Sequence, residues 1–189
     1  MLSSTRLEAL SGACDALSHL KAAAAPAVPD LTELLNHKDL WTRVKAAETL
    51  ANIGQPAIAT ATILLERLAQ KPTAEDPRGM EQRYLCFNVF GKMLKNSLAG
   101  VDQSLLRKAV VAGLQNQDGR ARGDIGGIYQ QLSYEQIKPL LPAIRESIVT
   151  PAPSGEMFAA GIGILAKHRI EEGMELCFVV MEIDKWGKA

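Results

Sequence analysis

The sequence predicts an all-α protein built as a stack of helical hairpins. A helix-turn-helix phrase recurs with a period of about forty residues, which is typical of repeat architectures. Alanine and leucine are abundant while aromatic residues make up only 5% of the chain, a balance that favours closely packed helices over β-sandwiches. Hydrophobic residues account for 47% of the 189 residues, so the chain can bury a continuous core.

The first predicted helix is a half-repeat over residues 5–24. The run from Thr5 to Glu8 has the form of a capping box, and apolar residues follow it at helical spacing. Pro26 and Pro29 then break the chain, because proline cannot continue the hydrogen-bond ladder of a helix.

The clearest hairpin phrase lies at residues 27–54. Its second helix is expected from Trp41 to Ile53, and Gly54 followed by Pro56 ends this helix, since glycine adopts the left-handed cap conformation. Helical spacing gives this helix an inward apolar face of Val44, Ala47, Leu50, Ala51 and Ile53.

The same order of residues predicts further hairpins downstream. The alignment pairs Asp39 with Asp76, Asp118 and Ser154, and it pairs Ile53 with Phe90, Leu132 and His168. It predicts hairpins at residues 57–97, 102–132 and 137–168 and a half-repeat at 171–183. The core columns expected from it are Ala47, Tyr84, Gly126 and Ile162, and Leu50, Phe87, Tyr129 and Leu165. Asp102 and the pair Ser133 and Gln136 have the form of helix caps.

The phrase from Pro29 through Leu35, followed by Asp39, Arg43 and Gly54, resembles the HEAT-repeat family of α-solenoids. The resemblance implies a right-handed α-α superhelix of about four to five hairpins, in which the second helices line the concave face. It implies no catalytic activity. In the downstream hairpins, the position of the arginine is taken by Met80, Arg122 and Phe158.

The family resemblance also implies a structural role for the turn residues. In HEAT repeats the turn aspartate and the arginine four residues later usually form a ladder that ties neighbouring repeats together. The residues of this expected ladder are Asp39, Arg43, Asp118 and Arg122.

The residues expected to bind a partner lie on the second helices and point away from the core. They form a mixed polar stripe of Trp41, Lys45, Glu48, Asn52, Gln82, Arg83, Arg120, Asp124 and Gln131. Trp41 beside basic residues has the composition of a protein-binding hot spot. A contact between Trp41 and the neighbouring repeat is an equally good interpretation.

The segment from Gly119 to Gly127 is unusual because glycine destabilises a helix interior by about 1 kcal/mol relative to alanine. A phosphate-binding loop is one interpretation, although the segment lacks the spacing and the preceding strand of the known motif. Close packing of helices, with Tyr129 and other large side chains filling the space, is the second interpretation. Local irregularity of the helix is the third.

Several site classes are not expected. Cys14, Cys86 and Cys177 lie in apolar helical stretches and suit buried free thiols. The histidines His19, His37 and His168 are isolated from other metal ligands, so the sequence predicts no metal, no cofactor and no catalytic residues. No segment has the length of a transmembrane helix, and the sequence favours a soluble protein with the cytoplasm as its compartment.

The favoured function is that of a non-enzymatic scaffold that binds a protein or a peptide on the concave face. The partner could be another part of its own parent chain. Lysine plus arginine balances aspartate plus glutamate at 21 each, which disfavours nucleic acid as the partner. The alternative is an enzyme or ligand-binding protein on a HEAT-like frame, similar to bilin lyases or alkylpurine DNA glycosylases.

Residues 1–189 are expected to form one repeat domain. The array opens with a lone helix of the second type and closes with one of the first type, whereas solenoids normally carry polar capping repeats. We therefore expect a segment of a longer protein or self-association through the uncapped end helices.

Overall fold

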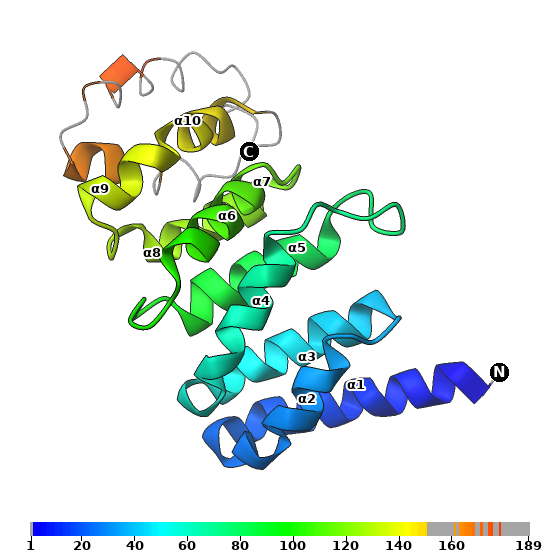
Figure 1. Cartoon of the computed structure of the whole chain (residues 1–189). Coiled ribbons are helices and arrows are strands. Elements are labelled where there is room, and N and C mark those ends of the chain that lie inside the picture. Colours follow the sequence, from blue (N-terminus) through cyan, green and yellow to red (C-terminus); the bar gives the residue numbers. More distant parts are fainter. Residues whose placement is uncertain are drawn as a thin grey trace.

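The fold is a stack of helices arranged in two layers (Figure 1). The computed structural model describes residues 2–150, 161, 163–168, 171, 174–175 and 178, and no strand occurs among them, so the all-α prediction is confirmed. The second-helix layer contains α1 (Leu2–Leu20), α3 (Leu40–Ile53), α5 (Met80–Cys86), η3 (Phe87–Met93), α7 (Gly119–Asp124) and α8 (Gly126–Tyr129). The first-helix layer contains α2 (Val28–Leu34), α4 (Ala61–Leu68), α6 (Gln103–Leu114) and α10 (Leu141–Val149). Short helical segments join them: η1 (Lys21–Ala27), η2 (Gln55–Thr60), α9 (Tyr134–Ile137) and η4 (Lys138–Leu140).

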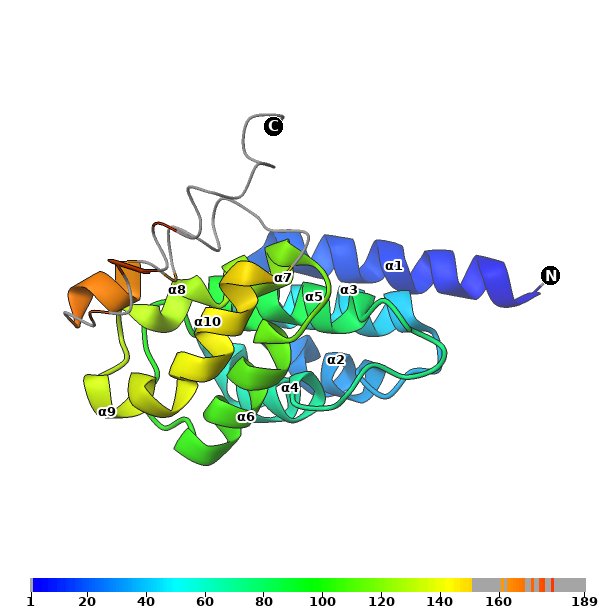
Figure 2. The same cartoon turned by 90° about the horizontal axis from the view of Figure 1, so that it is seen from above.

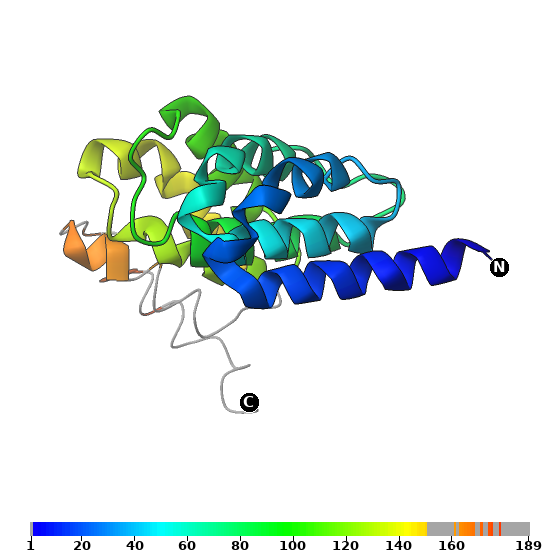
Figure 3. The same cartoon turned by 90° about the horizontal axis from the view of Figure 1, so that it is seen from below.

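Neighbouring helices of the same layer pack side by side. In the second-helix layer α1 contacts α3, α3 contacts α5, and α5 contacts α7 (Figure 2). In the first-helix layer α4 contacts α6, and α6 contacts α10. One continuous apolar core lies between the layers, as expected for an array in which each hairpin buries its apolar face against the next. The N-terminal end of α1 extends past the neighbouring helix α3 (Figure 3).

Helix α3 follows the sequence prediction closely. Asp39 caps its first turn by accepting a hydrogen bond from the Thr42 amide at 2.8 Å, and Gly54 ends it with φ of 77°. The predicted inward face is buried, with Val44, Ala47, Leu50, Ala51 and Ile53 each at most 7% exposed. Caps are also confirmed at Asp102 and at the capping box of Ser133 and Gln136.

The first helix begins and ends earlier than predicted. It begins at Leu2, so Thr5 lies within the helix and does not cap it. It ends at Leu20, because Lys21 has φ of 51°, and residues Lys21–Ala27 then form the 3-10 helix η1. Pro26 explains why the alanine-rich stretch does not continue as an α-helix, since its ring would clash with the carbonyl of the residue four positions earlier. The predicted end at residue 24 was therefore wrong.

The second hairpin has a different register from the predicted one. Gly79, at φ of 62°, immediately precedes α5 and takes the position that Asp39 has before α3, so Asp76 lies three residues too early to be its equivalent. Two residues predicted to be core differ from that prediction: Phe87 is 45% exposed and Tyr84 is half-buried. The residues that enter the core are instead Leu85, Cys86, Val89 and Phe90.

The π-helix η3 adds a second shift to this hairpin. The Leu94 amide donates to the Val89 carbonyl at 2.8 Å, five residues back, which accommodates one residue more than an α-helix does. As a result, Leu94 is 1% exposed and closes the core at the position that Ile53 occupies in the first hairpin.

The glycine-rich segment confirms the close-packing interpretation. A Cβ atom added at Gly127 would lie 2.7 Å from the Phe90 carbonyl oxygen, so α8 can approach η3 this closely only with glycine. The helix is also interrupted at Ile125, between α7 and α8, as the interpretation of local irregularity predicts. Tyr129 is 3% exposed, as expected of a core residue.

The end of the array is described in part. The first helix of the predicted hairpin at 137–168 corresponds to η4 and α10, and α9 precedes it from Tyr134. Pro139 and Pro142 occupy positions near the starts of η4 and α10. Leu165 is fully buried, as predicted, and Lys167 donates to the Gln130 carbonyl at 2.7 Å. The predictions for Ser154, Phe158, Ile162 and Cys177 lie outside the described residues, and so does most of the expected half-repeat at 171–183.

Candidate functional site

A groove of about 530 Å³ lies on the second-helix layer, bounded by α1, α3 and α5. Three of the predicted partner-binding residues, Trp41, Lys45 and Glu48, line it. The remaining walls come from Leu7, Glu8, Ser11, Asp39, Thr42, Val44 and Tyr84. We refer to these ten residues as the α1–α3 groove.

Trp41 is the largest exposed apolar side chain of this groove. It is the second residue of α3, and Asp39, which caps the helix, fixes the direction of that first turn. The indole is 52% exposed and meets the Tyr84 ring edge-on, with centroids 5.6 Å apart and an interplanar angle of 74°. Trp41 therefore contacts the neighbouring repeat, as the second interpretation predicts, and still exposes half of its surface to solvent.

Lys45 and Glu48 belong to a chain of charges that crosses from α1 to α3. The Lys45 ammonium lies 2.8 Å from Asp15 on α1 and 3.4 Å from Glu48 on its own helix. The hydrogen bond to Asp15 raises the pKa of Lys45 above its ordinary value. About a third of each side chain remains exposed, at 36% for Lys45 and 38% for Glu48, so both can still meet a partner.

Two other predicted partner-binding residues, Asn52 and Gln131, are occupied by contacts between neighbouring helices. Asn52 donates to Ser18 on α1 and accepts from Lys92 on η3. Gln131 donates to the carbonyls of Leu94 and Lys95, both at 2.8 Å. Each of these residues therefore joins two repeats.

Gln82 was wrongly assigned to the outward stripe. It is only 7% exposed, its amide donates to the Leu68 carbonyl at 3.0 Å, and its oxygen accepts from Asn116 at 2.8 Å. The cause is again the register, because Gln82 is the third residue after Gly79 just as the buried Thr42 is the third after Asp39.

Arg83 joins α5 to the turn before α7. Its Nε atom lies 2.8 Å from a carboxylate oxygen of Asp118, and its guanidinium carbon lies 4.8 Å from the centre of the Tyr84 ring. Arg120 on α7 is exposed and Asp124 is half-buried, and neither lines the α1–α3 groove. The predicted stripe is therefore divided between contacts that hold the array together and a smaller set around Trp41.

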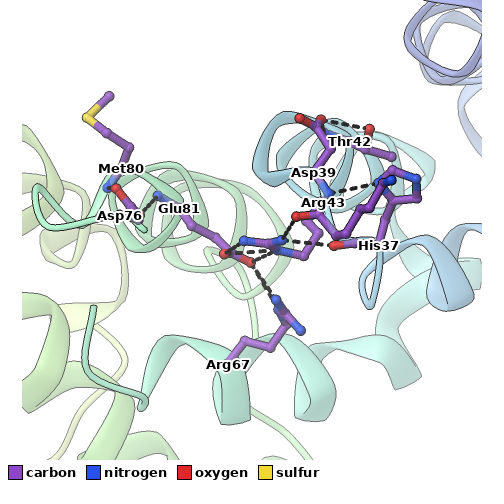
Figure 4. Close-up of polar contacts among 9 residues, drawn as sticks. His37, Asp39, Thr42, Arg43, Arg67, Asp76, Met80 and Glu81 are labelled. Carbon is purple, nitrogen blue, oxygen red and sulfur yellow. Dashed lines mark hydrogen bonds and ion pairs between the residues drawn. The ribbon is translucent and has the colours of Figure 1, made fainter. Parts of the chain in front are cut away.

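Three of the expected ladder residues, Asp39, Arg43 and Asp118, cap helices or join neighbouring hairpins. Asp39 caps α3, and Arg43 forms a bidentate ion pair with Glu81 on α5, with a shortest distance of 2.6 Å (Figure 4). Arg67 on α4 reaches the same carboxylate at 2.7 Å. Asp118 caps α7 through the Arg120 amide and pairs with Arg83. Glu81 thus joins α3, α4 and α5.

The arginine four residues after the helix cap donates to backbone carbonyls at equivalent positions in two hairpins. Arg43 donates to the carbonyls of His37 and Lys38, and Arg122 donates to those of Asn116 and Gln117. Because Gly79 is the cap residue of α5, the arginine position of the second hairpin is held by Arg83 and not by Met80.

Glu81 is the residue that the sequence interpretation missed. Burial raises the pKa of its carboxyl, but the hydrogen bonds and charges of Arg43 and Arg67 outweigh this effect and hold the pKa below its ordinary value. The available signal was Gly79, because a glycine before an apolar helical run indicates a backbone turn that only glycine adopts readily.

Other chemistry is limited in the described part of the chain. No group of three or more histidine, cysteine, aspartate or glutamate side chains that could hold a metal ion occurs there. Cys14 and Cys86 are free and buried, as predicted, and burial raises the pKa of both thiols. Within these residues no helix combines the length and the apolar character needed to cross a membrane.

Comparison with known proteins identifies the repeats in the N-terminal part. Residues 2–83 match the family model of HEAT repeats, which commonly serve as protein-interaction scaffolds and are usually non-catalytic. No curated protein and no solved structure matches the chain. The resemblance found between Pro29 and Gly54 is thus confirmed by a family match that covers residues 2–83.

Proposed function

We propose that this protein is a non-enzymatic scaffold that binds a protein partner through the α1–α3 groove. The observation that carries the proposal is Trp41, whose indole is 52% exposed at the edge of a groove of about 530 Å³. Partly exposed tryptophans held by a rigid neighbour are common anchors of protein interfaces, because they bury a large area at a small loss of side-chain entropy.

The array keeps this anchor in place before a partner arrives. The Tyr84 ring supports the indole, and the contacts of Lys45 with Asp15 and of Arg43 with Glu81 link α1, α3 and α5. A surface that is already ordered loses less entropy on binding than a flexible one.

The finer features of the solenoid belong to the same proposal. We infer a right-handed superhelix of about four to five hairpins, with residues 1–189 as one domain and the second-helix layer on its concave face. The continuous core between the two layers and the regular succession of α1, α3, α5 and α7 support this arrangement. A partner in a concave groove would contact several second helices at once.

Site-specific photo-crosslinking tests the proposal. A benzophenone amino acid replaces Trp41, and in a matched control it replaces Ile63, which is 36% exposed on α4 in the first-helix layer. We expect a protein from the source cells to crosslink at position 41 and not at position 63. Crosslinking at neither position, or equally at both, would contradict a binding site in the α1–α3 groove.

A further inference from the structure

We propose that the α1–α3 groove recognises a basic side chain, lysine or arginine, presented by an extended segment of the partner protein. This inference rests on the proposed function and adds the chemistry of the partner. It starts from the charges around Trp41 and from the apolar walls of the groove.

The charge of the groove is negative. Its lining includes three carboxylates, Glu8, Asp39 and Glu48, and one ammonium group, Lys45. Lys45 is matched most closely by Asp15, a fourth carboxylate at the border of the groove, at 2.8 Å. An acidic partner would meet like charges here, whereas a basic side chain would be attracted.

The remaining walls suit the carbon stem of a long basic side chain. Leu7, Val44 and the rings of Trp41 and Tyr84 give the groove an apolar surface next to its carboxylates. Lysine and arginine bury their methylene groups on such surfaces and keep the charged group among polar atoms. Their cationic groups are also attracted to the face of an exposed indole.

Among the described residues that line the groove, Lys45 is the cation, and its charge is shared by Asp15 at 2.8 Å and Glu48 at 3.4 Å. The Arg83 guanidinium contacts Tyr84, but it does not line the groove and its charge is matched by Asp118 at 2.8 Å. Lys92 contacts Phe87 and Asn52 farther along the same layer. The groove therefore keeps a surplus of negative charge that a cation of the partner can meet.

Fluorescence polarisation with defined peptides tests the inference. The probes are a labelled peptide in which lysine alternates with alanine, the same peptide with acetyl-lysine, and the same peptide with glutamate. We expect the lysine peptide to bind about tenfold more tightly than either of the other two, because only lysine combines the stem with a positive charge. Equal affinity for the lysine and acetyl-lysine peptides would overturn the inference, as would no binding of the lysine peptide.

A charge-matched pair of variants separates the groove from general electrostatic attraction. The double substitution Glu8→Gln and Glu48→Gln should weaken binding of the lysine peptide at least about fivefold. The control Glu33→Gln and Glu66→Gln removes the same charge from exposed positions on α2 and α4 and should leave the affinity unchanged. Circular dichroism verifies that both proteins are folded, and an equal loss in both would overturn the inference.

The outcomes distinguish this inference from the proposed function. If a partner crosslinks at position 41 but the lysine peptide does not bind, the scaffold function stands and the basic specificity fails. If the lysine peptide binds through Glu8 and Glu48 while no cellular protein crosslinks at position 41, the groove chemistry stands and the scaffold function fails.

Discussion

Replacing Glu81 with glutamine should strongly destabilise the fold. Among the described residues, no other exchange of a single surface carboxylate for its amide should have a larger effect. Glu81 accepts hydrogen bonds from Arg43 at 2.6 to 3.0 Å and from Arg67 at 2.7 and 3.1 Å, and its side chain is 17% exposed. Glutamine keeps the shape but removes the charge, and its amide group would face two guanidinium groups. Glu81→Gln therefore leaves two partly buried cations without their counter-ion.

The expected loss follows from the partial burial of the three side chains. Breaking a buried ion pair costs about 3–5 kcal/mol, while exposed pairs contribute about 0–1 kcal/mol. The three side chains are 15 to 22% exposed, so solvent screens part of the effect and we expect a loss of about 2–3 kcal/mol. With a urea dependence of about 2 kcal/mol per molar, the unfolding midpoint should fall by about 1 M.

The pH dependence gives the sharper test. Because the pKa of Glu81 is lower in the folded state than its ordinary value of 4.5, its stabilisation is fully present above that value. The stabilisation is lost as the pH falls through the folded-state pKa, where the carboxylate becomes protonated. The difference between the wild type and Glu81→Gln should therefore be constant from about pH 7 to about pH 5 and then shrink at lower pH.

Urea denaturation monitored by circular dichroism measures both quantities. Glu66→Gln is the matched control, since Glu66 is exposed on α4 and its substitution should change the free energy of unfolding by about 0.5 kcal/mol or less. The reasoning is refuted if Glu81→Gln is as mild as this control near neutral pH. It is equally refuted if the loss caused by Glu81→Gln is the same in acid as at neutral pH.

Two further substitutions test the local packing and the caps. Gly127→Ala places a Cβ atom 2.7 Å from the Phe90 carbonyl oxygen, and the overpacking cost of about 1–3 kcal/mol should exceed the gain in helix propensity of about 1 kcal/mol. Gly12→Ala places its Cβ atom in open space on α1 and should instead raise the midpoint of thermal unfolding. If Gly127→Ala and Gly12→Ala shifted this midpoint in the same direction, the packing account would be contradicted. Asp39→Ala should lower the free energy of unfolding by about 1 kcal/mol, because the hydrogen bond that caps the Thr42 amide is lost. Asp39→Asn should retain most of the wild-type stability in urea denaturation. An equal loss in both variants would argue against capping.

The first complete hairpin was predictable because its signals are local. Asp39 and Gly54 mark the start and end of α3, and the apolar spacing between them identifies the buried face without knowledge of any other segment. The match of residues 2–83 to HEAT repeats covers this region. The glycine-rich segment was harder, because the contact that requires Gly127 is made with Phe90, 37 positions earlier in the chain.

The second hairpin was mispredicted because two backbone features change its register. Asp76 has the identity expected of a turn aspartate, yet it reaches forward to the amides of Met80 and Glu81 while Gly79 precedes the helix. The π-helix η3 then adds a residue, and a π-helix has no strong sequence signature in this segment. The changed register places Gln82 at the position of the buried Thr42, and this is why Gln82 is buried. Phe87, the first residue of η3, is 45% exposed.

The polar residues of the second-helix layer have two different roles. Asn52, Arg83 and Gln131 look like free polar residues in sequence, but a solenoid must satisfy the polar groups between successive helices, and these side chains do so. Trp41 differs because α1 and α3 leave open space beside its indole. A surface residue of such an array is therefore a candidate for binding when one neighbour holds its side chain and an open groove lies on its other side. The residues around Trp41 meet both conditions.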